Sequence, residues 1–311
     1  MRIILETAEK IRRLEIQGAR SIAIAAIKAL EALATQTKVK SKEELLRELY
    51  RAREILFASR ATEPLMRNAI RRIIAQVERS PERSIKALAE VISSVAKLFL
   101  RDFDYSKEII AEIGAKRIKD GSIVFTHCHS STVTHLLKKA KEQGKLFEVI
   151  CTETRPLFQG RITARELVEA GIKTTLIVDA AARFFMNDAD MVIVGADAIT
   201  SEGNVVNKIG TSAIALIAKE ARTPFYVAAE LLKFDPATMY GDYEKIEERG
   251  PEEIWENPPE GLNIRNPAFD VTRRDFIHGI ICEEGIISPH SIIEVIHRRY
   301  PWIFSSTLPQ L

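Results

Sequence analysis

The first third of the chain has the spacing of amphipathic helices. From residue 1 to about residue 116, apolar residues recur three and four positions apart, with charged residues between them. The clearest stretches are "ILETAEKIRRLEI", "ARSIAIAAIKALEALA", "LLRELYRAREILF" and "IKALAEVISSVAKLFL". Pro64 and Pro81 each lie near polar residues that suit a helix start. The pattern predicts an N-terminal helical domain over residues 1–116, in which each helix buries one face.

The spacing changes after Gly121. Short runs rich in Val and Ile now alternate with helical stretches, which is typical of βαβ units around a parallel sheet. We expect strands in "SIVFTHC", "LFEVICTET", "KTTLIVD", "DMVIVGAD" and "PFYVAAE", and helices in "VTHLLKKAKEQG", "ARELVEAG", "AAARFFM" and "SAIALIAKEA". The stretch "VTRRDFIHGIICEEGIIS" should add a last helix and a strand before a C-terminal helix near "SIIEVIHRRY". We therefore predict an α/β fold, in which the helical domain is followed by a Rossmann-like domain over residues 117–311 with a mostly parallel sheet.

Composition narrows the class of protein. Hydrophobic residues make up 46% and charged residues 28%, and the 45 basic and 43 acidic residues leave a net charge of +2. This balance does not favour nucleic-acid binding, and no apolar run reaches the length of a membrane span. With no leader-like start, we expect a cytoplasmic protein. Abundant Glu, Lys and Arg with few Asn and Gln indicate a thermophile.

Three cysteines, Cys128, Cys151 and Cys282, are far apart in the sequence and form no CxxC pair. This spacing argues against a disulfide framework and against a structural zinc site. A single disulfide between two of them stays open.

Polar residues follow each predicted strand. Ligands of an open parallel sheet bind beyond the carboxyl ends of its strands. The segments at these positions are "THCHSS", "TETRP", "DAA", "GADAIT" and "AAELLKF". Together they would bring a thiol, carboxylates, cations and hydroxyls to one edge, so we predict a pocket there.

Cys128 is the first candidate for chemistry. A helix that opens near Ser131 would lower the pKa of its thiol through the helix dipole, and the alternative is a buried structural thiol. His127 and His129 point to opposite sides if the backbone is extended there. A zinc site would need further ligands nearby, so metal binding is the weaker interpretation.

Asp197 is the second candidate. It follows "MVIVGA", and a carboxyl in a dry pocket has a raised pKa that suits a general acid, whereas the alternative is a turn cap. The segment "EGNVVNKIGT" predicts a turn, a short strand and a helix start at Gly210 and Thr211. With Lys208 beside it, that helix start could bind phosphate; the alternative is a hairpin with a solvated lysine.

Two N-terminal loops, "IQGARS" and "ASRAT", are further candidates. Gly18 could serve only to let helices pack closely, and Arg60 could be an ordinary surface charge.

Six motifs together resemble a known family: "GAKRIKDGSIVFTHCHSS", "TETRPLFQG", "VGADAIT", "NVVNKIGT", "AAELLKFDP" and "NPAFDVT". The family unites archaeal ribose-1,5-bisphosphate isomerases, methylthioribose-1-phosphate isomerases and the regulatory subunits of translation initiation factor 2B. The resemblance covers nearly the whole chain. Its length, "CHS" and the tail "EEGIISP" are most similar to the first group.

The resemblance implies roles for particular residues. Cys128 and Asp197 match the catalytic cysteine and aspartate. The family's "RGAG"-like loop reads "QGAR" here and its "RPT" reads "RAT". The implied substrate-binding residues are Gln17, Gly18, Ala19, Arg20, Arg60, Ser130, Ser131, Asn207, Lys208 and Lys233.

The implied reaction is the isomerisation of α-D-ribose 1,5-bisphosphate to ribulose 1,5-bisphosphate in archaeal AMP and nucleoside breakdown. Asp197 would assist ring opening as an acid, and Cys128 would move a proton from C2 to C1. The alternatives are a non-catalytic regulatory partner of translation initiation factor 2 and a methylthioribose-1-phosphate isomerase. No cofactor or metal is required, activation by AMP is left open, and a homo-oligomer, a dimer or a hexamer, is implied.

Overall fold

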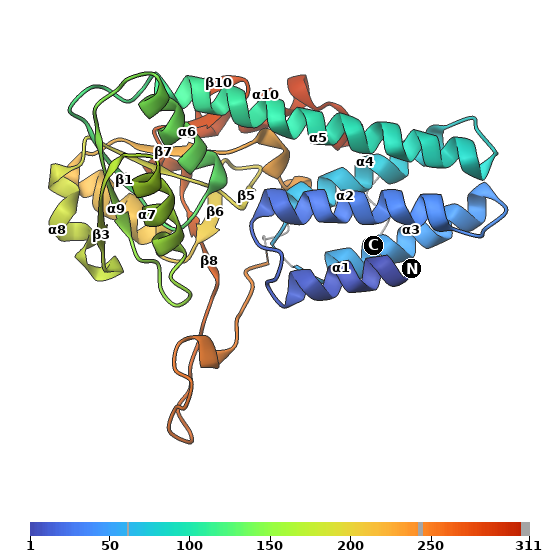
Figure 1. Cartoon of the computed structure of the whole chain (residues 1–311), viewed down its shortest axis with the longest axis horizontal. Helices are drawn as coiled ribbons and strands as arrows, with labels where there is room; N and C mark the ends of the chain where they lie inside the picture. The colour runs from blue at the N-terminus through green and yellow to red at the C-terminus, as the bar shows by residue number, and fades with distance from the viewer. Residues whose placement is uncertain (61, 242–244, 306–311) are drawn as a thin grey trace.

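The structure, a computed structural model, describes residues 1–60, 62–241 and 245–305. Its N-terminal part is a helical bundle, as predicted (Figure 1). The bundle helices are α1 (Arg2–Arg12), α2 (Ala19–Gln36), α3 (Lys42–Phe57), α4 (Pro64–Arg79) and α5 (Ile85–Ala115). Pro64 lies in the first turn of α4, where a missing N–H costs nothing. Pro81 lies in the link before α5. None of the helices in the described ranges has both the length and the apolar character that a membrane crossing requires.

The second part contains a seven-stranded sheet in the order β10-β9-β7-β4-β1-β2-β3. Its strands are β1 (Ile123–Thr126), β2 (Glu148–Thr152), β3 (Lys173–Ile177), β4 (Met191–Val194), β7 (Phe225–Ala228), β9 (Gly279–Cys282) and β10 (Gly285–Ile287). Every neighbouring pair is parallel except β9 and β10. The chain builds outward from β1 in one direction and from β4 in the other. The prediction of a Rossmann-like domain is confirmed, and its topological switch point lies between β1 and β4.

Helices cover both faces of this sheet. They are α6 (Ser131–Glu142), α7 (Gln159–Glu169), α8 (Ala182–Phe185), α9 (Thr211–Ala221) and α10 (Ile292–Arg299). The short α11 (Trp302–Ser305) follows α10 and contacts α4 of the bundle. Residues of α5, α6 and α7 form one core with Val124 and Val149. Phe125, one residue along β1, belongs to the opposite core, which is continuous with the helical bundle. The alternation along β1 therefore buries both faces of the sheet.

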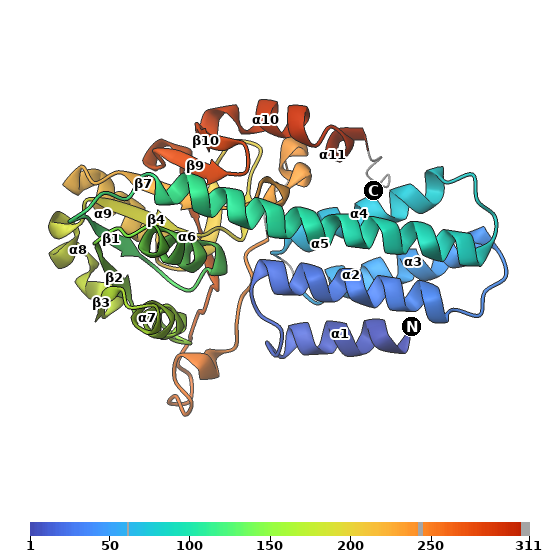
Figure 2. The same cartoon turned by 45° about the horizontal axis from the view of Figure 1, so that its top comes forward.

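The helix α5 belongs to both parts of the molecule. Leu88 and Ile92 near its start pack into the bundle core, whereas Ile110 and Ala111 near its end pack against the sheet. Figure 2 shows α5 running from the bundle across the sheet domain. The boundary predicted near residue 116 thus falls where α5 ends, and α5 itself connects the two cores.

Three details differ from the sequence prediction. A small antiparallel sheet of β5 (Ala198–Ile199), β6 (Val205–Lys208) and β8 (Phe269–Thr272) was not expected. The predicted last helix in "VTRRDFIHGIICEEGIIS" is wrong, because its first residues pair with β6 and only a short turn follows before β9 and β10. The helix expected in "AAARFFM" is reduced to the four residues of α8 between two 3-10 turns.

Short 3-10 helices occupy several connections of the sheet domain. They are η1 (Asp179–Ala181), η2 (Met186–Asp188), η3 (Leu231–Lys233), η4 (Pro236–Tyr240), η5 (Pro251–Glu253), η6 (Arg274–Phe276) and η7 (Pro289–Ser291). The segment 245–268, which includes η5, projects from the body as an arm (Figure 1). All three cysteines are free thiols.

Candidate active site

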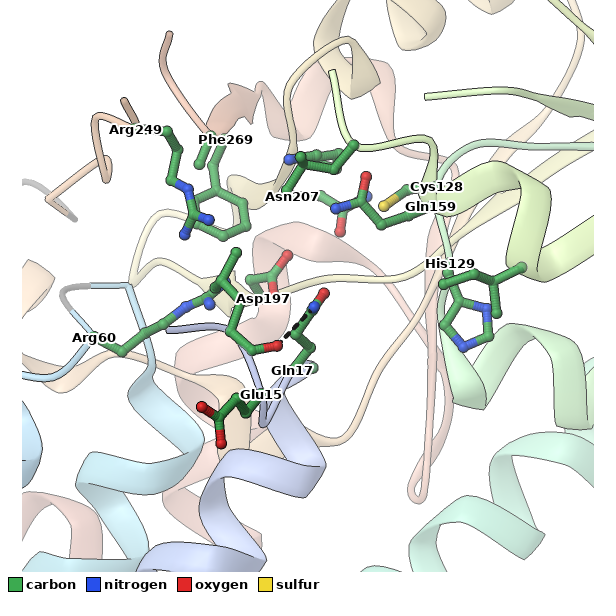
Figure 3. A pocket seen from close by; sticks show the side chains of 16 residues that line it. Glu15, Gln17, Arg60, Cys128, His129, Gln159, Asp197, Asn207, Arg249 and Phe269 are labelled. Carbon is green, nitrogen blue, oxygen red and sulfur yellow. Dashed lines mark hydrogen bonds between the residues drawn. The ribbon is translucent and has the colours of Figure 1, made fainter. Parts of the chain in front are cut away.

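Two adjoining pockets lie where the carboxyl ends of β1 and β4 meet the helical bundle, with volumes of about 290 Å³ and about 130 Å³. They share Gln17, Gly18, His129, Asp197 and Asn207 in their linings. Each site residue predicted from the sequence lines at least one of them. The larger pocket adds Arg60, Cys128 and Lys208, and the smaller adds Ala19, Arg20, Ser130, Ser131 and Lys233. Figure 3 shows the larger pocket with Cys128 at one side and Arg60 at the other.

The backbone turns sharply at Cys128, just after β1. Its φ is +66°, a left-handed conformation that costs a non-glycine residue about 1–2 kcal/mol. Two threonine hydroxyls hold this conformation. The Cys128 N–H donates to Thr154 Oγ1 at 2.9 Å, and Thr163 Oγ1 donates to the Cys128 carbonyl at 2.8 Å. The turn brings the thiol to the pocket wall beside Gln159 (Figure 3).

The predicted lowering of the Cys128 pKa is wrong. Burial raises the pKa of this thiol to about 12, and the charge of Lys208 and the backbone N–H of His129 oppose that rise only in part. The reason is one of position. The start of α6, capped by the Ser130 side chain, lines the smaller pocket, whereas the thiol lines the larger one. Burial of the thiol is the largest influence on its pKa and outweighs any stabilisation by the start of α6.

The two histidines beside Cys128 have different surroundings. The expectation that they point to opposite sides assumed an extended backbone, which the left-handed Cys128 does not have. His127 is buried, with Nδ1 at 2.6 Å from Thr152 Oγ1 and Nε2 at 2.9 Å from the Ile209 carbonyl. His129 lines both pockets, and its Nδ1 lies 3.1 Å from Thr163 Oγ1. Within the described ranges, no group of three or more His, Cys, Asp or Glu side chains is placed to hold a metal ion.

Asp197 lies just beyond β4 and is partly exposed, into the pocket. Burial raises the pKa of its carboxyl, and the charges of Lys233, Arg60 and Lys208 act against that rise. Its backbone N–H donates to the Val206 carbonyl at 2.9 Å, so the main chain is fixed by the small sheet while the carboxyl faces the cavity. The predicted raised pKa is confirmed, which suits an acid.

Two helix starts contribute to the smaller pocket. The residues at the start of α2 and α6 line it, so unpaired backbone N–H groups of both helices are available to an anion there. Gly18 precedes α2 with φ +80°, and a Cβ on it would meet open space. Its left-handed backbone, rather than close helix packing, therefore explains the glycine. At the far wall, a Cβ on Gly195 would lie 2.7 Å from Ser130 Cβ, so β4 and the start of α6 are in close contact.

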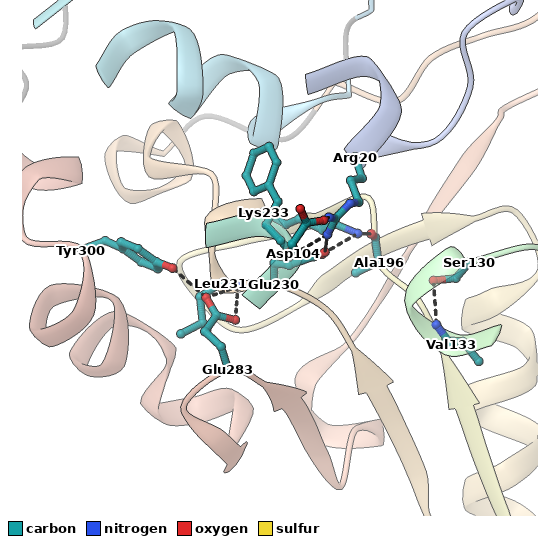
Figure 4. Close-up of polar contacts among 11 residues, drawn as sticks. Arg20, Asp104, Ser130, Val133, Ala196, Glu230, Leu231, Lys233, Glu283 and Tyr300 are labelled. Atoms are coloured by element: carbon teal, nitrogen blue, oxygen red, sulfur yellow. Dashed lines mark hydrogen bonds and ion pairs between the residues drawn. The ribbon is translucent and has the colours of Figure 1, made fainter. Parts of the chain in front are cut away.

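Arg20 and Lys233 carry the positive charge of the smaller pocket. The Arg20 guanidinium donates to the Phe103 carbonyl and to Asp104 Oδ1, each at 2.5 Å, and so is tied to α5. Lys233 Nζ donates to the Ala196 carbonyl at 2.7 Å (Figure 4). Both cations lie within 4 Å of the buried Glu230, at 3.7 Å and 3.4 Å. Arg20 is thus held in place but already has anionic partners.

The larger pocket contains cations that sequence reasoning only partly found. Arg60 Nε lies 3.3 Å from Glu247 Oε2, and Arg249 contacts the other oxygen of Glu247 at 2.6 Å. Phe269 lies under Arg60 at 5.6 Å and under Lys208 at 6.0 Å. The alternative that Arg60 is an ordinary surface charge is therefore wrong. The alternative that Lys208 is a solvated lysine is also wrong, because Lys208 is only 8% exposed.

Polar lining residues that the sequence prediction missed include Gln159, His129 and Arg249. Gln159 stands within the quoted motif "TETRPLFQG", and His129 within "THCHSS", so a signal existed for both. Arg249 belongs to the arm and does not follow a predicted strand. A search limited to residues just beyond strand ends therefore could not find it. Leu14, Leu157 and Ile162 add apolar surface to the same pocket.

The comparisons with known proteins agree with this geometry. The model of the initiation factor 2 subunit family matches residues 15–289. A ribose 1,5-bisphosphate isomerase from Pyrococcus furiosus is 42% identical over 99% of this chain and 98% of its own length. One from Archaeoglobus fulgidus is 46% identical, over 96% and 94%. A Pyrococcus horikoshii structure, called translation initiation factor eIF-2B, is 36% identical with a TM-score of 0.80 and covers 92% of this chain and 97% of its own. The chain therefore belongs to the initiation factor 2 subunit family.

Proposed function

We propose that this chain is an isomerase that converts α-D-ribose 1,5-bisphosphate into ribulose 1,5-bisphosphate. The observation that carries the proposal is the pair of adjoining pockets, which together place the Cys128 thiol and the Asp197 carboxyl between two separate regions suited to anions. Burial raises the pKa of the Asp197 carboxyl. The activity of the two archaeal isomerases that resemble this chain over nearly their full length supports it.

The two anion-binding regions match the two phosphates. In the smaller pocket, the helix starts at Ala19 and Ser131 and the ammonium of Lys233 bind one phosphate. In the larger pocket, Arg60 and Lys208 bind the other, with Asn207 between the two regions. A substrate with a single phosphate would leave one of these two regions without a phosphate.

The chemistry needs one acid and one base. Asp197 protonates the ring oxygen as the bond from that oxygen to C1 breaks. Cys128 takes the proton from C2, which leaves a C1–C2 enol that carries the phosphate on C1. Cys128 then returns the proton to C1, while Asp197 accepts the proton of the C2 hydroxyl as the ketone forms. Both side chains end in their starting protonation states.

The thiol must first ionise to act as a base. Burial holds it neutral in the free pocket, so only a small fraction is thiolate at neutral pH. Lys208 and the His129 N–H both stabilise the thiolate. The rate should therefore rise with pH until the acid group loses its proton.

A regulatory role in translation initiation is the second candidate function. It is favoured by one observation: Gln17, at the position where the isomerases have arginine, donates to the Leu14 carbonyl at 2.8 Å, a contact within its own loop. A chain whose loop had stopped binding phosphate would keep the fold and lose the reaction.

The test is a phosphorus NMR assay of the purified chain with α-D-ribose 1,5-bisphosphate, with and without AMP, and with methylthioribose 1-phosphate in parallel. Conversion of the bisphosphate by the parent and by Cys282→Ser, but not by Cys128→Ser or Asp197→Asn, is the expected result. Cys282 is the matched control, because it is a buried thiol outside both pockets. No conversion by the parent would leave the regulatory candidate, and conversion of the methylthio sugar alone would change the substrate.

Two further expectations belong to this proposal. The reaction needs no cofactor or metal, so dialysis against a chelator should leave the rate unchanged. The chain assembles as a dimer or a hexamer, and sedimentation velocity would distinguish these from a monomer.

A further inference from the structure

One cation of the larger pocket comes from the arm. Arg249 lies at the base of the arm and lines this pocket, and its side chain is 13% exposed. The two segments of the base pair with each other: the Arg249 N–H donates to the Asn266 carbonyl at 2.9 Å, and the Ala268 N–H donates to the Glu247 carbonyl at 2.8 Å. These hydrogen bonds fix the main chain on both sides of the pocket-lining arginine. The proposed reaction assigns its guanidinium no role.

Two carboxylates hold the Arg249 guanidinium in place. Its Nε and Nη2 donate to Glu253 Oε1 at 3.0 Å and 2.8 Å, and its Nη1 donates to Glu247 Oε1 at 2.6 Å. Asn266 holds Glu253 in turn, because its side-chain N–H donates to Glu253 Oε2 at 3.2 Å. A guanidinium has five N–H donors. Among the residues that the structure describes, these contacts use three, so one N–H on each of Nη1 and Nη2 is left for a ligand.

Glu247 also joins Arg249 to Arg60. Its Oε2 lies 3.3 Å from Arg60 Nε, so this carboxylate stands between two guanidiniums. A second contact ties the loop of Arg60 to the arm, because the Thr62 hydroxyl donates to the Lys245 carbonyl. Arg60 Nε and Nη1 are buried and have no hydrogen-bond partner within the described ranges. Figure 3 shows Arg249 on the same side of the pocket as Arg60.

The cations of this cluster face the cavity, and the carboxylates that hold them do not. Arg60, Arg249 and Lys208 all line the larger pocket, whereas Glu247 and Glu253 are absent from its lining. An anion in the pocket would therefore meet the three cations directly and the two carboxylates only behind them. Guanidinium N–H groups form charge-assisted hydrogen bonds with phosphate oxygens, often two at a time.

We propose that Arg249 is a substrate-binding residue: its two remaining N–H groups contact, together with Arg60, the phosphate that enters the larger pocket. The inference rests on the proposed function for the identity of the sugar bisphosphate. Glu247 is a positioning residue that orients both guanidiniums, and Glu253 fixes Arg249 from within the arm. Side chains held in this way before the phosphate arrives lose little conformational freedom when it binds.

The kinetic test compares the parent with Arg249→Met and Arg249→Lys, and Arg265→Met is the matched control. Arg265 lies on the same arm and pairs with Glu248 at 3.0 Å, but it lines neither pocket. In Arg249→Met, KM for the sugar bisphosphate should rise about tenfold or more while kcat stays within about threefold, because the phosphate contact is present both before and during the reaction. Arg249→Lys keeps the charge and should recover part of the rise. Arg265→Met should keep the parent's KM.

A purely structural role for Arg249 gives a different pattern. The side chain would then serve only to join Glu247 to Glu253, and a lysine has no planar fork with which to reach both carboxylates. Both Arg249 variants would lower the melting temperature and leave KM unchanged. That pattern, or a parent-like KM in Arg249→Met without any change in the melting temperature, would overturn the proposal.

Binding measured without turnover separates this proposal from the proposed reaction. Calorimetric titration with ribulose 1,5-bisphosphate gives Kd for Cys128→Ser alone and for Cys128→Ser combined with Arg249→Met or with Arg265→Met. The Arg249 combination should raise Kd about tenfold or more, and the Arg265 combination should not. If binding depends on Arg249 but the parent does not isomerise the sugar, only the proposed function fails. If the parent isomerises it and Kd does not depend on Arg249, only this proposal fails. Absence of binding to Cys128→Ser and to the parent alike would overturn both.

Discussion

Removing one hydroxyl should release the strained turn that presents Cys128. Thr163 is 1% exposed, and its Oγ1 donates to the Cys128 carbonyl at 2.8 Å. Thr163→Val keeps the shape of the side chain but leaves that carbonyl without this donor. An unpaired buried acceptor costs about 1–3 kcal/mol. The left-handed backbone at Cys128 stores about 1–2 kcal/mol that the hydrogen bond helps to offset.

These magnitudes set the expected effects of Thr163→Val. The free energy of unfolding should fall by about 1–2 kcal/mol, measured by urea unfolding. If the turn relaxes by a similar amount, kcat should fall roughly 5- to 30-fold, with the thiol displaced from the pocket wall. Thr163→Ser retains the hydroxyl and should retain most of the activity. Parent-like kcat and stability in Thr163→Val would refute the idea that this hydrogen bond holds the turn.

Three other perturbations give separate checks. Gly195→Ala would place a Cβ 2.7 Å from Ser130, so it should push the start of α6 away. We expect kcat to fall while the melting temperature changes little. A large fall in the melting temperature would argue for a general packing defect. Asn68→Ala removes two hydrogen bonds, of 2.9 Å and 2.7 Å, to carbonyls of the 231–234 turn and should cost about 2–4 kcal/mol in urea unfolding. Glu283 has a pKa of about 7 in the fold, above the ordinary 4.5, so its contribution to stability is complete below pH 4.5 and is lost as pH rises through 7. Glu283→Gln should remove about 3 kcal/mol of that pH dependence between pH 5 and pH 8, and an unchanged slope would contradict this assignment.

The sequence was most informative about reactive and charged residues that come just after a strand. Cys128, Asp197 and Lys233 each come shortly after an apolar run, and the parallel topology brings such positions together. Periodicity likewise identified the bundle helices and most strands of the large sheet, whereas the order of those strands comes from the structure alone. The segment 269–276 misled the prediction, because pairing with β6 decides its conformation and that partner is about 65 residues away.

The remaining features depend on tertiary contacts. The raised pKa of Cys128 arises from burial at an interface that the local sequence does not describe. Arg249 reaches the pocket from the arm through ion pairs with Glu247 and Glu253. Such residues can be found only once distant segments are placed together.

The continuous helix α5 has a mechanical consequence. Its 31 residues span about 46 Å without a break, and it is packed into the bundle at one end and onto the sheet at the other. We therefore expect the molecule to behave as one stiff body, in which substrate exchange does not require the bundle and the sheet domain to move apart. A pair of fluorophores, one on α3 and one on α9, should report the same separation with and without the sugar bisphosphate; a clear shortening on binding would show that α5 bends.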